Sequence, residues 1–259
     1  MHQLVDQLAA IVAQFRDPFV TLFSILALSF TLLASFLNYR SLKKRFTSDF
    51  PALLAYFGFF FLLLFAVPLV YLLLAGRPAG LTPAMLGLRI GNWKIGLVSC
   101  LVAIPLVLIT LSNSARDPVI RAWYPFSKDA TTSIGRFLLY EAAYILLYYL
   151  AWDFAFRGLI QFSLIRLLPA GMPGTIVAIM AQTLLSTVYH LGHPDSEIWG
   201  AFAVGIIFGA ITAATGSILY AFAIHALIGM GNDLYIYTSG RRGSPPNAHR
   251  RSRARGGAS

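Results

Sequence analysis

Apolar residues dominate the chain in long runs separated by short polar or turn-forming stretches. The runs cover 18–38, 52–75, 95–112, 134–151, 152–168, 174–191, 199–214 and 217–237. A helix of about 20 apolar residues spans the hydrocarbon core of a bilayer, so this pattern is typical of membrane-spanning helices. The stretch 134–168 is too long for one ordinary span, and is either one long tilted helix or two spans that meet near Trp152. The pattern therefore predicts an all-α, polytopic transmembrane helical bundle of seven or eight spans.

Residues 1–17 show a different pattern, in which apolar side chains recur on one helical face while most polar side chains lie elsewhere. This pattern favours a short amphipathic helix that lies in the membrane interface and ends at Asp17 and Pro18. The segment does not resemble a signal peptide, because it lacks a basic leader and carries Asp6 within its apolar run.

Composition supports a membrane protein, since 58% of the residues are hydrophobic and only 12% are charged. Soluble domains are nearer half apolar and a quarter charged. The single cysteine, Cys100, lies in an apolar run and excludes both an internal disulfide and a cysteine-only metal cluster.

The formal net charge of +10 owes much to the C-terminal residues 239–259, which contain six arginines and no acid. Proline, glycine, serine and arginine do not form a packed core, so we expect a disordered tail over 238–259 that contacts anionic lipid. Nothing else in the chain supports nucleic-acid binding. The predicted organisation is an interfacial helix (1–17), a membrane domain (18–237, with its motifs in 134–237) and the tail.

Basic residues also set the predicted orientation. The loop 38–46 holds four bases and no acid, which favours the cytoplasmic side, as does the tail. Both assignments together require an odd number of spans and an N-terminus outside, whereas eight spans with both ends inside place this loop outside. The number of spans stays open at seven or eight.

Three stretches place ionisable side chains in or near the membrane, where each is costly unless it is paired or hydrated. Asp153 and Arg157 lie four residues apart and share a helix face, so they can neutralise each other. An internal salt bridge that orients the helix would explain this pair if it stood alone.

The second stretch is "HLGHPDSE" (190–197). His190 ends an apolar helix, and the residues after it form a predicted loop that holds His193, Asp195 and Glu197. In the third, His225 lies within the last apolar run, and Asn232 and Asp233 come two turns later on roughly the same face. Histidines and carboxylates together are the groups that activate water. Three such stretches that can converge predict a polar site inside the membrane.

In this order, the three stretches resemble the CPBP family of membrane proteins, which includes the CAAX prenyl endopeptidases and bacteriocin-immunity proteins. The family pattern is Glu-Glu-x-x-x-Arg, then a helix end with histidine, then His-x-x-x-Asn or Asp. The matching stretches are "WDFAFRG" (152–158), "STVYH" (186–190) and "GAITAATGSILYAFAIHAL" (209–227). The upstream "MLGLRIGNWKIGL" (85–97) also looks familial, so the resemblance covers roughly 85–237.

The resemblance implies an intramembrane endopeptidase, with two departures from the family pattern. The first glutamate, which is thought to activate water, aligns with Trp152, and the last Asn or Asp aligns with Gly229. Either Asp153 or Glu197 then supplies the base, and Asp233 takes the place of the missing partner of His225.

In the expected mechanism, the carboxylate deprotonates water and Arg157 keeps Asp153 ionised. His190 and His225 stabilise the tetrahedral oxyanion. No cofactor is expected to be required, although His190, His225 and Glu197 together are an alternative ligand set for a divalent metal such as zinc.

Two other functions compete with the protease. A catalytically degenerate pseudoprotease would keep the fold as a membrane scaffold or as an immunity or regulatory protein, and Trp152 at the first glutamate position favours it. A small transporter or proton relay is weaker, because the runs lack symmetric broken halves. The expected partners are the lipid bilayer and a peptide or membrane-protein substrate, with or without a lipid, and the expected location is a bacterial cell membrane, crossed several times.

Overall fold

The computed structural model describes residues 7, 17–76 and 80–242, and every regular element within them is helical. The longer α-helices are α2 (Pro18–Ser35), α4 (Asp49–Phe61), α6 (Trp93–Arg116), α8 (Ile134–Ala143), α11 (Met172–Val188), α12 (Asp195–Thr215) and α13 (Leu219–Arg242). The shorter ones are α3 (Tyr39–Lys43), α5 (Val67–Tyr71), α7 (Pro118–Trp123), α9 (Leu150–Asp153) and α10 (Ser163–Leu167). The all-helical class predicted from the sequence is confirmed for the described residues.

Local signals fix where these helices begin. Pro18 stands at the first position of α2, and the Asp17 carboxylate accepts hydrogen bonds from the backbone amides of Phe19 and Val20. Asn92 and Ser133 cap α6 and α8 in the same way. A cap satisfies backbone donors that have no partner inside the helix, so these side chains set the boundaries of the predicted runs.

The stretch 134–168 is one helix from Ile134 to Leu167 rather than two. It contains α8, α9 and α10 joined by π-helical turns at Tyr144–Tyr149 and Phe154–Phe162. Such turns insert extra residues into an α-helix and are frequent at functional sites. Here they flank Asp153 and contain Arg157, so the backbone irregularity lies where the sequence predicts the site.

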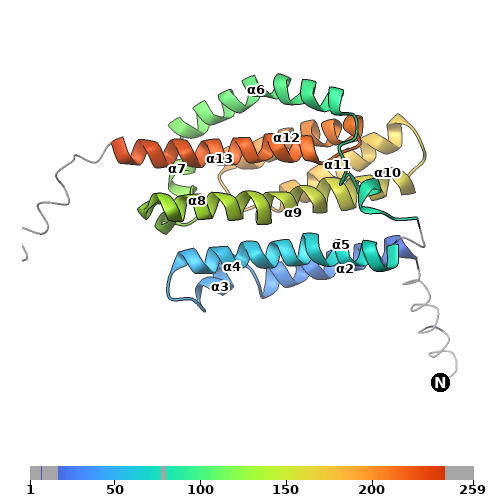
Figure 1. Ribbon diagram of the computed structural model, residues 1–259, viewed down its shortest axis with the longest axis horizontal. Coiled ribbons are helices and arrows are strands. Elements are labelled where there is room, and N and C mark those ends of the chain that lie inside the picture. The colour runs from blue at the N-terminus through green and yellow to red at the C-terminus, as the bar shows by residue number, and fades with distance from the viewer. Residues whose placement is uncertain (1–6, 8–16, 77–79, 243–259) are drawn as a thin grey trace, which may run out of the picture.

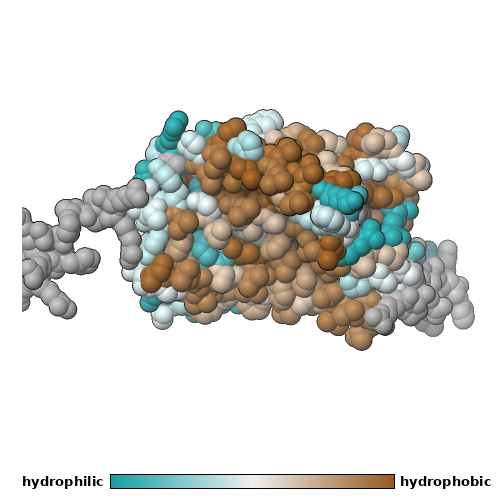
Figure 2. All heavy atoms as spheres, turned by 45° about the horizontal axis from the view of Figure 1, so that its top comes forward, coloured by the Kyte–Doolittle hydropathy of each residue, from teal (hydrophilic) through white to brown (hydrophobic). Residues whose placement is uncertain are grey.

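Among the described residues, five helices are long and apolar enough to cross a membrane, namely Pro18–Ser35, Asp49–Gly76, Trp93–Ser114, Ile134–Leu167 and Asp195–Thr215. Met172–Val188 is a shorter apolar helix. Hydrophobic residues cover most of the face in Figure 2, and hydrophilic residues lie mostly toward the two ends. The protein is therefore a membrane protein. The count of seven or eight spans stays a prediction.

The helices run along the long axis of the molecule in layers (Figure 1). The helices α2, α4 and α5 pack on one side of α8–α10, and α13 lies between that long helix and α6. The main core joins Leu22 and Leu33 of α2 to Trp152, Phe154 and Phe156 of the long helix. The middle of the long helix is thus covered by other helices, and its polar side chains Asp153, Arg157 and Gln161 are buried inside the protein.

Two predicted segments need comment. The interfacial helix at 1–17 lies almost entirely outside the described residues and stays a prediction. The helix α13 continues to Arg242, so residues 238–242 are helical and the prediction of a disordered tail from 238 is wrong for this part. The rest of the predicted tail, 243–259, lies outside the described residues.

Candidate functional site

A buried charged triplet connects two helices. Asp153 Oδ1 accepts a hydrogen bond from Arg157 Nη1 at 2.8 Å, and Asp153 Oδ2 lies 3.0 Å from His225 Nδ1. Asp153 is fully buried and Arg157 is 3% exposed. Because an ionised carboxylate only accepts hydrogen bonds, His225 carries its proton on Nδ1. The remaining nitrogen, Nε2, is free for chemistry.

Helix α13 places His225 beside two further rings. The ring of Tyr149 lies 4.2 Å from the imidazole between centroids, and that of Phe208 lies 5.6 Å away. The guanidinium of Arg157 also lies over Phe208, at 5.4 Å. These contacts and the bond to Asp153 fix the imidazole orientation from several sides.

A second polar triplet is centred on Glu197. The oxygen Oε1 accepts a hydrogen bond from the Tyr124 hydroxyl at 2.7 Å and lies 2.8 Å from His193 Nδ1. The other oxygen, Oε2, has no partner among the described residues. Burial, together with the negative charge of Glu197, raises the pKa of Tyr124, so its hydroxyl remains a donor.

Glu197 and Asp195 lie in the first turn of α12, because that helix begins at Asp195. The prediction that they lie in a loop is therefore wrong, although Gly192 does turn the chain with a φ of 95°. Acidic residues in a first turn are stabilised by the helix dipole. His193 and Glu197 are four residues apart, so the turn at the beginning of α12 brings their side chains within bonding distance.

His190 follows the end of α11 and lies between Trp152 of the long helix and His193 of the second triplet. Its Nδ1 lies 2.9 Å from the carbonyl oxygen of Ser186, which can only accept, so Nδ1 carries the proton and Nε2 has the lone pair. Its ring lies 5.1 Å from that of Trp152 and 5.6 Å from that of His193. Burial lowers the pKa of His190, so the neutral form is favoured.

One cavity of about 380 Å³ brings these groups together. Its polar lining includes Asn113, Ser114, Asp117, Tyr124, His190, His193, Glu197, His225 and Asn232. The three stretches singled out in the sequence thus converge, with the two predicted histidines and Glu197 on one cavity. Asp153 and Arg157 do not line it and act on it only through His225.

Asp233 lies elsewhere. Its Oδ2 accepts a hydrogen bond from the Tyr140 hydroxyl at 3.0 Å, and it does not line the cavity. The partner of His225 is Asp153. The expectation that Asp233 pairs with His225 is therefore wrong, because from α13 the two residues reach different partners on the long helix, Tyr140 and Asp153.

The position of Gly229 explains the absence of a larger side chain there. A Cβ atom at Gly229 would overlap the hydroxyl of Tyr149, which fills the space where such a side chain would begin. The aligned family position holds Asn or Asp, so in this chain a tyrosine hydroxyl from the long helix occupies that place beside His225. No sequence motif marks Tyr149 or Tyr124 as part of the site.

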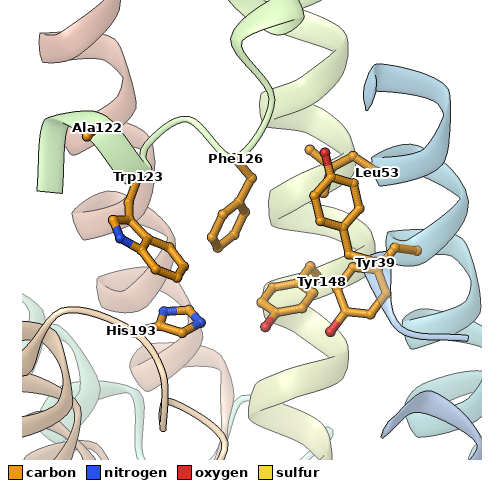
Figure 3. A pocket seen from close by; sticks show the side chains of 8 residues that line it. Tyr39, Leu53, Ala122, Trp123, Phe126, Tyr148 and His193 are labelled. Atoms are coloured by element: carbon orange, nitrogen blue, oxygen red, sulfur yellow. The ribbon is translucent and has the colours of Figure 1, made fainter. Parts of the chain in front are cut away.

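An aromatic chamber of about 460 Å³ adjoins the cavity. It is lined by Tyr39, Leu53, Tyr56, Ala122, Trp123, Phe126, Tyr148 and His193, most of which are labelled in Figure 3. Trp123 lies against His193, with ring centroids 4.9 Å apart. Because Phe126, Tyr148 and His193 line both spaces, the chamber borders the polar cavity directly.

Within the described ranges, no three His, Cys, Asp or Glu side chains are grouped so that they could hold a metal ion. The ligand set of His190, His225 and Glu197 is not assembled in this conformation, and Glu197 is engaged with His193 and Tyr124 instead. The zinc site stays a prediction from the sequence.

Comparison with known protein families gives a match in the central part of the chain. The family described as type II CAAX prenyl endopeptidase Rce1-like matches residues 135–230, which include the long helix and both histidine stretches. The resemblance predicted from the motifs is thus confirmed over this range, while the upstream stretch 85–97 lies outside the match. No curated protein and no solved structure matches the chain.

Proposed function

We propose that the protein, whose residues 135–230 match the Rce1-like CAAX prenyl endopeptidase family, is an intramembrane endopeptidase that hydrolyses peptide bonds with an activated water molecule. The observation that carries the proposal is the single cavity onto which His190, Glu197 and His225 converge from three separate stretches. An ionisable group at membrane depth is costly, and a cavity that gathers several of them is typical of a functional site.

In this proposal Glu197 is the general base. Two donors, Tyr124 and His193, hold its Oε1, which leaves Oε2 to accept the proton of the attacking water. Asp153 is a poorer candidate, because Arg157 and His225 engage both of its oxygens and it is fully buried. Its role is to position His225, as the aspartate of a catalytic triad positions its histidine.

The two histidines differ in what they can do. His190 is neutral near pH 7 and presents a lone pair on Nε2, so it accepts a hydrogen bond from the water rather than donating one to an oxyanion. His225 lies beside the Asp153 carboxylate, and once protonated at both nitrogens it can donate from Nε2. We therefore assign oxyanion stabilisation, and later proton transfer to the leaving amine, to His225.

The proposed substrate is a peptide or membrane-protein segment with a large apolar group. The aromatic chamber borders the cavity and offers rings and apolar side chains for such a group, whether a lipid or an aromatic side chain (Figure 3). Burial of apolar surface in the chamber would place the scissile bond over the cavity.

The test is cleavage of lipidated and unlipidated peptides by the full chain purified in detergent. We expect Glu197→Gln and His190→Ala to abolish cleavage. Asp195→Asn is the matched control, because it removes a carboxylate from the same first turn of α12, where the side chain is exposed and outside the cavity. Cleavage that survives Glu197→Gln but not His190→Ala would return the base to Asp153.

One observation favours the pseudoprotease. Trp152 stands at the position of the family's first glutamate, and its ring lies edge-on against His190. An indole cannot take a proton from water. If the folded wild type cleaves no peptide in the panel, the protein is a scaffold or regulator that keeps the family's helices without its chemistry.

A further inference from the structure

A second group of buried polar side chains lies between the start of the long helix and α13, and the proposed hydrolysis uses none of them. Glu141 is 4% exposed, Asp233 is fully buried and Asn232 is 9% exposed. Four of their oxygens have no hydrogen-bond partner among the described residues, namely Glu141 Oε1 and Oε2, Asp233 Oδ1 and Asn232 Oδ1. Buried polar atoms are almost always paired, so four orphaned oxygens in one region need an explanation.

The packing of the two helices places these side chains together. The rings of Phe137 and Tyr237 stack at 4.3 Å, and the Tyr140 hydroxyl bonds Asp233. Glu141 lies one turn after Phe137, and Asp233 lies one turn before Tyr237. Because residues four apart share a helix face, Glu141 is opposite Asp233 in this antiparallel pair.

Electrostatics agrees with this placement. The negative charge of Asp233 acts on Glu141, and the amide N–H of Asn232 donates to the Asp233 carboxyl. Two carboxyl groups therefore face one another between the helices, with the Asn232 side chain beside one of them. Buried charges are normally paired or coordinate a metal, so two facing carboxylates need a cation or a proton between them.

The nearest cation does not bond to either carboxyl group. The charge of Lys128 acts on Asp233 from a distance, but its Nζ donates to the backbone carbonyls of Tyr124 and Arg121, at 2.6 and 3.3 Å. Among the described residues, neither Glu141 nor Asp233 forms an ion pair. A proton shared by the carboxyls would leave the Asn232 oxygen unpaired.

We propose that Glu141, Asp233 and Asn232 bind a hard divalent cation, with Ca²⁺ as the best fit. Carboxylate and amide oxygens are the ligands that Ca²⁺ prefers, and two carboxylates balance its charge. Ca²⁺ tolerates irregular coordination, whereas Mg²⁺ demands a near-ideal octahedron. The Tyr140 hydroxyl holds Asp233 Oδ2 and so orients the other oxygen toward the ion.

The site is next to the catalytic cavity without being part of it. Asn232 lines that cavity, which offers the ion a path and water molecules to complete its coordination, while Glu141 and Asp233 lie behind it. A bound cation would tie the long helix to α13, the two elements that also carry Asp153 and His225. Its predicted effect is therefore on stability first.

The test measures calcium binding directly, by calorimetry on the full chain in detergent, and thermal melting in the presence of Ca²⁺, Mg²⁺ or Na⁺. We expect Ca²⁺ to bind and to raise the melting temperature of the wild type, as any ligand of the native state does. Glu141→Gln and Asp233→Asn should each weaken binding by about tenfold or more. Asp49→Asn is the control, because it removes an exposed carboxylate from α4 and should bind Ca²⁺ as the wild type does.

Three results would overturn the proposal. One is a wild type that binds no divalent cation at up to about 10 mM, ten times the dissociation constant of the weakest calcium sites. Another is Ca²⁺ binding that is lost in Glu197→Gln but kept in Glu141→Gln, which would place the ion in the catalytic cavity. The third is a Glu141→Gln variant that melts at a higher temperature than the wild type, while Ca²⁺ changes the melting temperature of neither protein. That result is expected if the Glu141 and Asp233 carboxyl groups share a proton instead of a cation. None of these measurements depends on peptide cleavage.

Discussion

Removing Arg157 tests the buried charged triplet. In Arg157→Met the side chain keeps much of its length but loses its charge, and Asp153 stays fully buried without its partner at 2.8 Å. Breaking a buried ion pair by removing one partner costs about 3–5 kcal/mol. For a chain of this size each kcal/mol lowers the melting temperature by about 2–4 °C, so we expect a loss of roughly 6–20 °C.

A second substitution separates the charge from the packing. Asp153→Asn combined with Arg157→Met removes both charges but leaves an amide oxygen that can still accept the hydrogen bond from His225 Nδ1. The double variant should therefore recover at least half of the lost stability, because no uncompensated charge stays in the core. It should still lack activity, since a neutral amide does not stabilise a protonated imidazole.

The assay is thermal melting in detergent, followed by tryptophan fluorescence. Lys43→Met is the matched control, since it breaks the exposed pair with Asp49, which has the same 2.8 Å distance. Exposed pairs contribute little, so its melting temperature should stay nearly unchanged. If Arg157→Met melts within about 2 °C of the wild type, a shift well below the size expected for a broken buried pair, then Asp153 is not a buried ionised group.

Three further results are expected. Because burial lowers the pKa of His190 below the ordinary 6.5, the unfolded chain binds more protons than the folded chain below pH 6.5. The free energy of unfolding should therefore decrease as the pH is lowered through that range. Melting curves across pH should show a smaller decrease in His190→Gln. Gly229→Asn should lower the melting temperature because its side chain overlaps Tyr149, and adding Tyr149→Ala should restore it; no loss in the single variant would contradict the close approach. Trp152→Glu should destabilise the protein without raising cleavage, because its ring packs against Phe156 at 4.8 Å and Tyr148 at 5.8 Å; faster cleavage would mean that this position still serves as the base.

Much of the fold could be predicted from the sequence, because hydrophobic runs and capping residues mark helices locally. Asp17-Pro18 and Ser133 begin helices where the pattern predicts them. The long helix was ambiguous, since Trp152 and Asp153 interrupt an apolar run much as a loop would. The stretch contains no proline and no turn signal between 134 and 157, and this absence of helix breakers is the sequence feature that favours one helix.

The site could be predicted only in part. The pair Asp153–Arg157 follows from helical spacing, and His190 and His225 follow from motifs. Proline followed by acidic residues, as in Pro194-Asp195, is a signal for a helix start that the loop interpretation overlooked. Tyr124 could not be found, because it lies 73 residues from Glu197 in the chain and no local pattern connects them.

The two departures from the family pattern have one physical consequence in common. At Trp152 and at Gly229 the expected polar groups are missing, and aromatic residues of the long helix, Trp152 itself and Tyr149, fill the space beside His190 and His225. The carboxylate that remains on the cavity, Glu197, comes from α12 and is held by Tyr124. If the first glutamate were lost and no other carboxylate replaced it, the two histidines would lie beside aromatic side chains without a base to activate water. Because Tyr124 and His193 hold Glu197, this carboxylate does not depend on the long helix, and on this ground we favour the proposed relocated base over the decay of an unused one.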